Sequence, residues 1–168
     1  VENNLSSVAS QLFIRYLHET FPTEVCGSHN LAVPRNLFYE VGQYNQSFNL
    51  TAGDDRELWD RWLAAGYKIY YSPAVIVYHR HVMSPKKIWL QFRRYGRSAY
   101  RFSEIAATNG RPTSPFNTVR FQVKAALYPF KCSTRSFVRK CKLSGLIVLT
   151  QVAYFFGIVE ETVRTKRR

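Results

Sequence analysis

Residues 53–62, with the sequence GDDRELWDRW, contain four of the eleven acidic residues of a strongly basic chain. The 168 residues carry 24 Lys and Arg against 11 Asp and Glu, which gives a formal net charge of +13. Crowded carboxylates repel one another unless a helix N-terminus, a metal ion or a reaction that needs a base offsets the repulsion. The stretch therefore marks the start of a helix, a site with chemistry, or both.

A capped amphipathic helix is the plain structural explanation of this stretch. Asp54 followed three residues later by Glu57 fits an acidic capping box, and apolar residues follow at helical spacing. Gly66 is a typical residue for the C-terminal end of such a helix. Asp55 is not needed for capping, so it is the first candidate for chemistry.

Two runs after this helix predict strands. Residues 67–72 (YKIYYS) are rich in aromatic residues, and residues 74–79 (AVIVYH) are β-branched and mostly apolar, as in a buried strand. The second run ends at His79, and His81 lies two residues further on, on the same face of a strand. Such a histidine is more often structural, but beside a helix start that carries carboxylates it becomes a candidate metal ligand.

Several short blocks, in a characteristic order and spacing, carry a family resemblance. They are residues 27–35 (GSHNLAVPR), 41–44 (VGQY), 53–58 (GDDREL), 65–67 (AGY), and Pro73 with residues 77–81 (VYHRH). Over about residues 26–102 they resemble the second half of family 2 glycosyltransferases. The resemblance implies an α/β fold, with a partial GT-A (Rossmann-like) sheet and helices. Residues 67–79 and a short strand at 27–33 would form the edge of that sheet, and a basic, largely helical C-terminal region would follow.

The same resemblance implies a reaction. Members transfer a sugar, usually with inversion, from a nucleotide-sugar donor to a hydroxyl of a glycan or lipid-linked acceptor, here in cell-surface polysaccharide or glycolipid synthesis. Their acidic pair maps onto Asp54 and Asp55, and the second acid, Asp55, would be the general base that takes the hydroxyl proton. His79 falls where several members help to hold a divalent metal, Mg²⁺ or Mn²⁺, on the donor diphosphate. Asn30, in the first block, is expected near the acceptor or donor.

Residues 91–95 (QFRRY) resemble the Gln-x-x-Arg-Trp motif of processive polysaccharide synthases. Tyr95 replaces the Trp, and Gly96 and Arg97 follow as in non-processive relatives. Arg94 of this motif is a second residue expected near the acceptor or donor. An apolar stripe from residue 85 onward predicts a helix, with most of the basic residues around it on a solvated or lipid-facing surface.

The donor-binding half of a glycosyltransferase has no counterpart in this sequence. No Asp-x-Asp motif closes a run of strands, and no Gly-rich phosphate loop is present. We therefore expect residues 1–105 to be the acceptor-side portion of a longer enzyme, followed by a linker at 106–118 and a helical extension at 119–168. The main metal ligands would lie in the missing N-terminal half, so this segment alone is expected to be inactive.

Residues 145–159 (GLIVLTQVAYFFGIV) are almost wholly apolar. They are fewer than the roughly 20 residues that a spanning helix needs. A buried core helix, an interfacial helix beside basic flanks on an anionic membrane, and a spanning helix all remain open. Three cysteines without metal-ligand spacing indicate a reducing compartment. We therefore expect a cytoplasmic protein, peripheral at the inner face of the membrane.

A non-catalytic basic module that binds membranes or nucleic acid is the alternative function. The basic charge would suit either partner. Residues of a helix-turn-helix, an RNP motif or a zinc site are not found, and the apolar run is unusual for a nucleic-acid-binding protein. We therefore expect no nucleic-acid partner.

Overall fold

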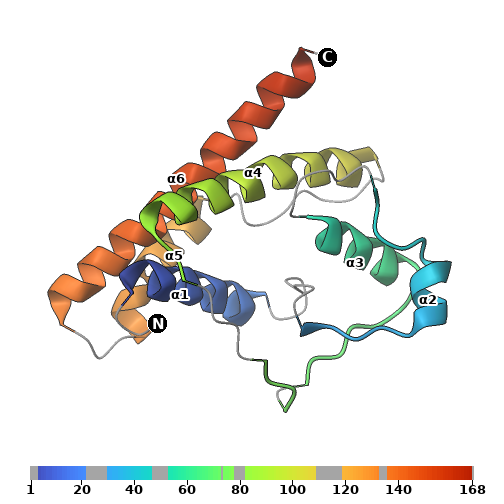
Figure 1. The fold of residues 1–168 in the computed structure, drawn as a ribbon, viewed down its shortest axis with the longest axis horizontal. Coiled ribbons are helices and arrows are strands. Elements are labelled where there is room, and N and C mark those ends of the chain that lie inside the picture. The colour runs from blue at the N-terminus through green and yellow to red at the C-terminus, as the bar shows by residue number, and fades with distance from the viewer. Residues whose placement is uncertain are drawn as a thin grey trace.

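The computed structural model describes residues 4–21, 30–46, 53–72, 74–77, 82–108, 119–132 and 136–167. They form the helices that Figure 1 labels: α1 (Leu5–Thr20), α2 (Arg35–Glu40), α3 (Asp54–Ala64), α4 (Pro85–Thr108), α5 (Val119–Cys132) and α6 (Phe137–Lys166). Helix accounts for 77% of these residues, and none of them lies in a strand. The expected α/β fold with a partial GT-A sheet is therefore wrong for the described chain, which is all-helical.

Within the described residues, the expected strand segments have no neighbouring strand to pair with. A strand is stable where a neighbouring strand pairs its N–H and C=O groups. The amide of Asn30 donates to the carbonyl of Val75 at 3.1 Å, so two of the expected strand segments approach, but through a side chain. Tyr70, Tyr71 and Ile76 are 85%, 81% and 67% exposed. The β-branched pattern here gives extended, uncovered chain without a ladder.

The start of α1 is tied to the segment that leads into α4. Asn4 caps α1 because its side-chain oxygen accepts a hydrogen bond from the backbone N–H of Ser7 at 3.0 Å. The amide nitrogen of Asn4 also donates to the carbonyl of Met83 at 2.8 Å, and the Met83 N–H donates to the hydroxyl of Ser7 at 2.9 Å. These bonds place the beginning of α4 beside α1.

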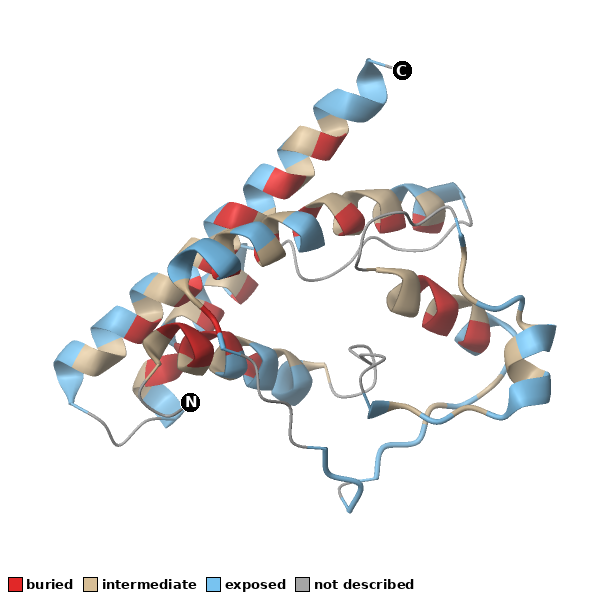
Figure 2. Cartoon of the chain, in the orientation of Figure 1, coloured by how far each residue is buried: buried red, intermediate tan, exposed pale blue. Residues whose placement is uncertain are grey.

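The main core lies between α1, α5 and α6, and Figure 2 shows its buried residues on the facing sides of these helices. It is formed by aromatic and aliphatic side chains: Ala9, Tyr16, Phe121, Ala125, Tyr128, Leu143 and Ile147. A second cluster continues it between α4 and α6 through Met83, Ile88, Phe92 and Ala153, with Phe13 packed against both clusters. The expected 1–105 portion and the expected extension thus share packed surfaces.

The predicted helix from residue 85 is confirmed as α4, with Ile88, Phe92 and Phe102 buried along the predicted stripe. This helix crosses α6 at backbone contact. A Cβ atom on Gly96 would lie 1.9 Å from the carbonyl oxygen of Tyr154, and one on Gly157 would lie 2.0 Å from that of Arg93. Only glycine fits at these two positions, which is how small residues let helix backbones approach closely.

The helix α6 is longer than the apolar run in the sequence, with 30 residues. Among the described helices it is the one long and apolar enough to cross a membrane, judged by length and composition. Only 28% of its most apolar window is buried inside the protein. Among the described residues α6 is therefore not fully buried, and its 30 residues are enough to span a membrane.

Candidate active site at the start of α3

The acidic turn at the start of α3 is not closed by a capping box. Gly53 is the N-cap, with φ 91°, and it makes no side-chain cap hydrogen bond. Asp54 and Asp55 are therefore the first two residues of the helix, and the expected capping role of Asp54 is wrong. A helix N-terminus favours negative charge, so this position offsets part of the repulsion between the carboxylates.

Asp54 and Asp55 are both half-buried. One oxygen of Asp55 accepts a hydrogen bond from the backbone N–H of Arg56 at 2.8 Å, which fixes the carboxylate against its own turn. The turn therefore places two acids next to each other in the sequence at the start of the helix.

Tyr44 is a site residue that sequence reasoning missed. Burial raises the pKa of Tyr44, and the charges of Asp54 and Asp55 raise it further. Its ring packs edge-on against Phe38, with the ring centroids 5.6 Å apart. At neutral pH Tyr44 thus keeps its O–H donor near both carboxylates. The one signal in the sequence was its place in the block VGQY.

The ion pair between Glu57 and Arg61 holds the loop that carries Tyr44. The Arg61 guanidinium donates to both oxygens of Glu57, at 2.7 and 2.8 Å, and also to the carbonyls of Val41 and Gln43. Glu57 is only 5% exposed, so its charge depends on this partner. Glu57 is therefore a structural acid, and the pair holds residues 41–43 against the helix of the acidic turn.

Arg56 attaches the acidic turn to the rest of the helices. Its guanidinium carbon lies 4.6 Å from the centroid of the Phe102 ring on α4, in a cation–π contact. Burial raises the pKa of Tyr154 on α6, and the charge of Arg56 opposes that rise, so Arg56 also lies near α6. The start of α3 therefore touches α4, and lies near α6, through the side chain of Arg56.

The expected metal ligand His79 lies outside the described residues, as does His81. Within the described part of the chain, no three His, Cys, Asp or Glu side chains come together in a way that could hold a metal ion. Asn30 is exposed, and its amide bonds to Val75 of the extended segment after α3.

Arg94, the other residue expected near the substrates, is exposed on α4. Around it, Gln91 donates from its amide to the hydroxyl of Tyr95 at 2.5 Å. Exposed Lys86 and Lys87 fit the expected solvated surface of this helix. The Gln-x-x-Arg-Tyr residues thus lie on an outward part of α4, with Arg94 available to a ligand from solvent.

Three neighbouring arginines of α4 are ion-paired with α6, contrary to the expected solvated surface. Arg93 donates to Glu160 at 2.6 Å, while Arg97 and Arg101 donate to the two oxygens of Glu161 at 2.8 and 2.7 Å. Burial alone would raise the pKa of Glu161, but its hydrogen bonds and ion pairs with the two arginines outweigh burial and lower it. We call these three bonds the Arg–Glu lock.

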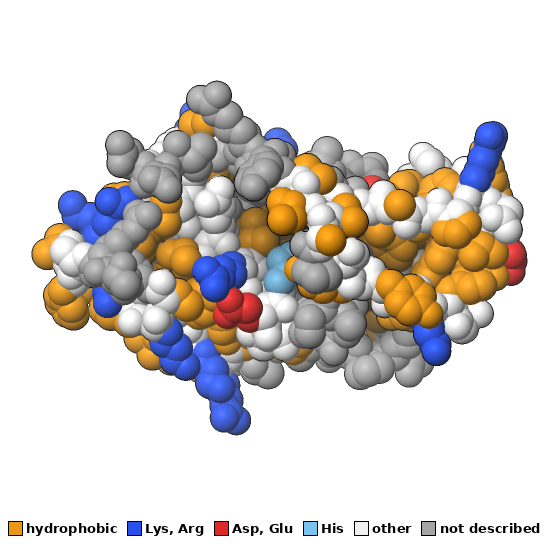
Figure 3. Space-filling view, turned by 90° about the horizontal axis from the view of Figure 1, so that it is seen from below, with side chains coloured by type: hydrophobic (Ala, Val, Ile, Leu, Met, Phe, Trp, Pro, Cys, Tyr) orange, Lys and Arg blue, Asp and Glu red, His pale blue; other side chains and the backbone are white. Residues whose placement is uncertain are grey.

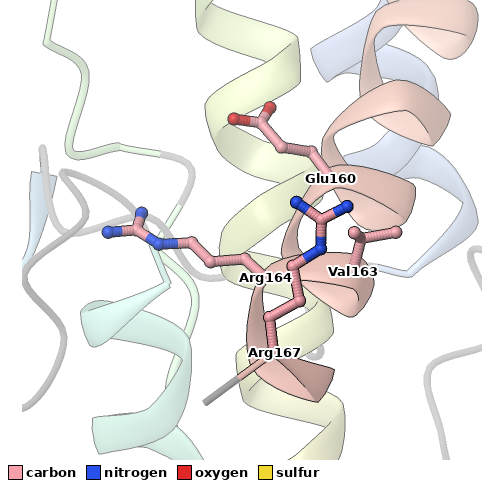
Figure 4. Close-up of a pocket in the computed structure, with 4 residues that line it drawn as sticks. All are labelled: Glu160, Val163, Arg164 and Arg167. Carbon is pink, nitrogen blue, oxygen red and sulfur yellow. The ribbon is translucent and has the colours of Figure 1, made fainter.

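A shallow hollow on α6 lies next to this lock and is lined by Glu160, Val163, Arg164 and Arg167 (Figure 4). In Figure 4 the side chain of Arg167 points toward Glu160, while that of Arg164 extends to the other side. The two guanidinium groups do not converge on one point, so the hollow is a poor anion site. Asp54 and Asp55 do not line it.

Comparisons of the chain with protein-family models, with curated proteins and with solved structures found no match. The resemblance to family 2 glycosyltransferases therefore rests on the order and spacing of the sequence motifs. Sugar transfer is accordingly a proposal, supported by the chemistry of the acidic turn.

Proposed function

We propose that this chain is the acceptor-side part of an inverting glycosyltransferase that transfers a sugar from a nucleotide-sugar donor to a glycan or lipid-linked acceptor. The observation that carries the proposal is the acidic turn of α3. Two half-buried carboxylates stand at the positions of the family motif, Gly53 rather than either acid is the N-cap, and the Tyr44 hydroxyl lies nearby.

In this proposal Asp55 is the general base. It accepts the proton of the acceptor hydroxyl while that oxygen forms a bond to the anomeric carbon of the sugar. The bond from the anomeric carbon to the diphosphate breaks on the opposite face, so the configuration inverts. Tyr44, protonated at neutral pH, is placed to donate a hydrogen bond to Asp55 or to the acceptor. Asn30 and Arg94 remain proposed contacts of the substrates.

A divalent metal, Mg²⁺ or Mn²⁺, belongs to the proposal through the family resemblance alone. The described residues by themselves do not fit such an ion, because they bring no three suitable ligands together. We propose that His79 supplies one ligand and that the others, with the donor-binding groups, come from an N-terminal half of the enzyme. The proton transfer to Asp55 depends on the side chains of this chain and not on the metal.

We place the protein in the cytoplasm, peripheral at the inner face of the membrane. The length and apolar composition of α6 support association with a membrane. Cys132 and Cys141 are free thiols, as is usual in a reducing compartment. A membrane location also suits a lipid-linked acceptor. Specific retention on DNA or RNA, but not on anionic vesicles, would favour the nucleic-acid-binding alternative.

The experiment that tests the proposal uses the enzyme with its donor-binding half attached. Release of nucleotide from a panel of nucleotide sugars is measured with and without acceptor. Asp55→Asn should lower turnover by about 10² to 10⁴-fold with donor binding little changed. Asp60→Asn makes the same chemical change later in α3 and should leave turnover within about threefold. Near-normal turnover of Asp55→Asn would exclude Asp55 as the base.

A further inference from the structure

The helix α6 has two unlike faces. One face packs on the other helices through buried residues such as Leu143, Ile147 and Ala153. The opposite face is apolar and exposed, at 41–64% for each of six side chains. We call these residues the outer face of α6: Val148, Val152, Phe155, Phe156, Val159 and Val163. Phe156 lies at the edge of this face, where its ring also packs against that of Trp89 on α4, with the centroids 5.6 Å apart. At 100° per residue they fall within an arc of about 100°, so they form one continuous stripe.

The stripe is large enough to be an interaction surface. From Val148 to Val163 it runs about 22 Å along the helix axis. Apolar residues scattered singly on a surface are ordinary, whereas a continuous exposed patch marks a site of protein or membrane contact. The stripe therefore needs a partner of matching apolar character.

The charges around the stripe select the partner. Lys140 and Lys142 precede it on α6, and Arg164, Lys166 and Arg167 follow it. Figure 3 shows Lys and Arg side chains projecting around apolar ones at the end of the molecule where Figure 1 places the start of α6. A second copy of a chain with net charge +13 would be repelled. An anionic lipid bilayer satisfies both the apolar stripe and its basic ends.

The Arg–Glu lock decides how α6 meets that bilayer. On the packed face, Glu160 and Glu161 bind three arginines of α4, and Gly96 and Gly157 bring the two backbones into contact. If α6 crossed the membrane, α4 would enter the hydrocarbon beside it. Helix α4 also carries the exposed charges of Lys86, Lys87 and Arg94, whose burial in lipid is very unfavourable.

We propose that α6 lies along the surface of an anionic bilayer, with its outer face in the boundary between headgroups and acyl chains and with α4 on the aqueous side. The Arg–Glu lock keeps α6 at this surface, although the length and composition of α6 would allow it to span the bilayer. This inference refines the membrane location proposed above and is independent of sugar transfer, because every test below uses the chain alone and lipid.

The first test is vesicle binding by the purified 168-residue chain. Vesicles of phosphatidylcholine are compared with vesicles that also contain about one-third phosphatidylglycerol. We expect saturable binding to the anionic vesicles, weak binding to the neutral ones, and release as salt is raised. Phe155→Asp should weaken binding at least about tenfold, because it places a charge in the outer face. Ile76→Asp, at a position as exposed as Phe155, should change binding by less than about twofold. Equal effects of the two variants would overturn the proposed face.

The second test measures orientation. A single cysteine carrying a fluorophore is placed at Val148 or Val163, with the native cysteines replaced by serine, and its depth is read with nitroxide lipids labelled at different depths. We expect both positions at the same shallow depth. In a spanning helix the two sites would differ in depth by well over about 10 Å, since they lie about 22 Å apart along the axis. A difference of that size would overturn the surface orientation.

The third test removes the lock. The double variant Glu160→Leu with Glu161→Leu keeps the outer face of α6 but removes the charges that bind α6 to α4. The labels at positions 148 and 163 should then lie at different depths in the bilayer. Glu160→Gln with Glu161→Gln keeps the side-chain shape and one acceptor oxygen on each residue, and should shift the depths in the same direction by less. Folding of each variant is followed by far-ultraviolet circular dichroism. Unchanged depths in a folded double variant of either kind would show that the lock does not hold α6 at the surface.

Discussion

The glycine crossing of α4 and α6 allows a matched pair of substitutions in one helix. Gly157→Ala adds a methyl group 2.0 Å from the carbonyl oxygen of Arg93, while Gly145→Ala adds one with no atom within 4 Å. Both glycines lie inside α6, so both changes gain the same helix propensity, about 1 kcal/mol. The two variants therefore differ mainly in the contact with α4.

The size of the clash sets the expected difference. An ordinary carbon–oxygen contact is about 3.4 Å, so α4 and α6 must separate by about 1.4 Å to admit the methyl group added at position 157. Overpacking of this kind costs about 1–3 kcal/mol, and the separation also strains the neighbouring bonds to Glu161. After the propensity gain, we expect Gly157→Ala to lower the free energy of unfolding by about 0–2 kcal/mol. Gly145→Ala should raise it by about 0.5–1 kcal/mol.

The assay is urea unfolding of the full chain, followed by helix circular dichroism and analysed with a common m-value. Equal stability of Gly157→Ala and Gly145→Ala would show that the two backbones can separate without loss, and would contradict the expected clash. A change in m-value for Gly157→Ala alone would point to an altered native packing instead of a simple loss of stability.

Four further predictions follow, two from the structure and two from the sequence motifs. Glu161→Gln should make the free energy of unfolding fall less steeply as the pH is lowered. The pKa of Glu161 in the folded protein lies below its ordinary 4.5, so its contribution to stability is complete above about pH 4.5 and is lost as the pH falls through the folded pKa. Arg61→Ala should lower the free energy of unfolding, measured in urea, by about 2 kcal/mol, because it leaves Glu57 as a buried charge without its partner. A loss as small as that of the exposed Arg15→Ala would contradict the stabilising role of the Glu57–Arg61 pair. In the intact enzyme, His79→Ala should weaken activation by metal, with partial recovery in added Mn²⁺; activity indifferent to chelator would remove His79 as a ligand. Calorimetric titration of this chain alone with nucleotide sugars and Mn²⁺ should show no saturable binding, and micromolar binding would place the donor site within it.

Local signals in the sequence predicted local structure well. The stripe of Ile88, Phe92 and Phe102 predicted α4, since helix periodicity is a property of neighbouring residues. Gly66 ends α3 as predicted, with φ 85°. The backbone N–H of Gly66 donates to the carbonyl of Leu63, and that of Tyr67 donates to the carbonyl of Trp62. The rings of Trp62 and Tyr67 also pack together. At the other end, Gly53, with a positive φ, is the N-cap in place of Asp54, which the sequence pattern did not show.

Signals that depend on distant partners were misread. The run 74–79 has strand-forming residues, but a strand needs a ladder from elsewhere, and the described chain supplies none. The pairing of Arg97 with Glu161 spans 64 positions, so the arginines of α4 looked like a solvated surface. Tyr44 lies near the acids because Arg61 on α3 holds the loop just before Tyr44 through the carbonyls of Val41 and Gln43. Of the site, the position of the two acids was predictable, and their neighbours were not.

The stacking of Arg56 on Phe102 has a consequence for what the proposed enzyme could reach. This contact attaches the acidic turn to α4, and the Arg–Glu lock attaches α4 to α6. The position of Asp55 relative to α6 is therefore fixed. Arg56 also lies near Tyr154 of α6, so the acidic turn keeps a fixed place beside α4 and α6. With α6 on a bilayer, the proposed base would act only on acceptor hydroxyls that come within reach of that place. Reach, and not a contact that recognises chemical identity, would then limit which acceptors meet Asp55.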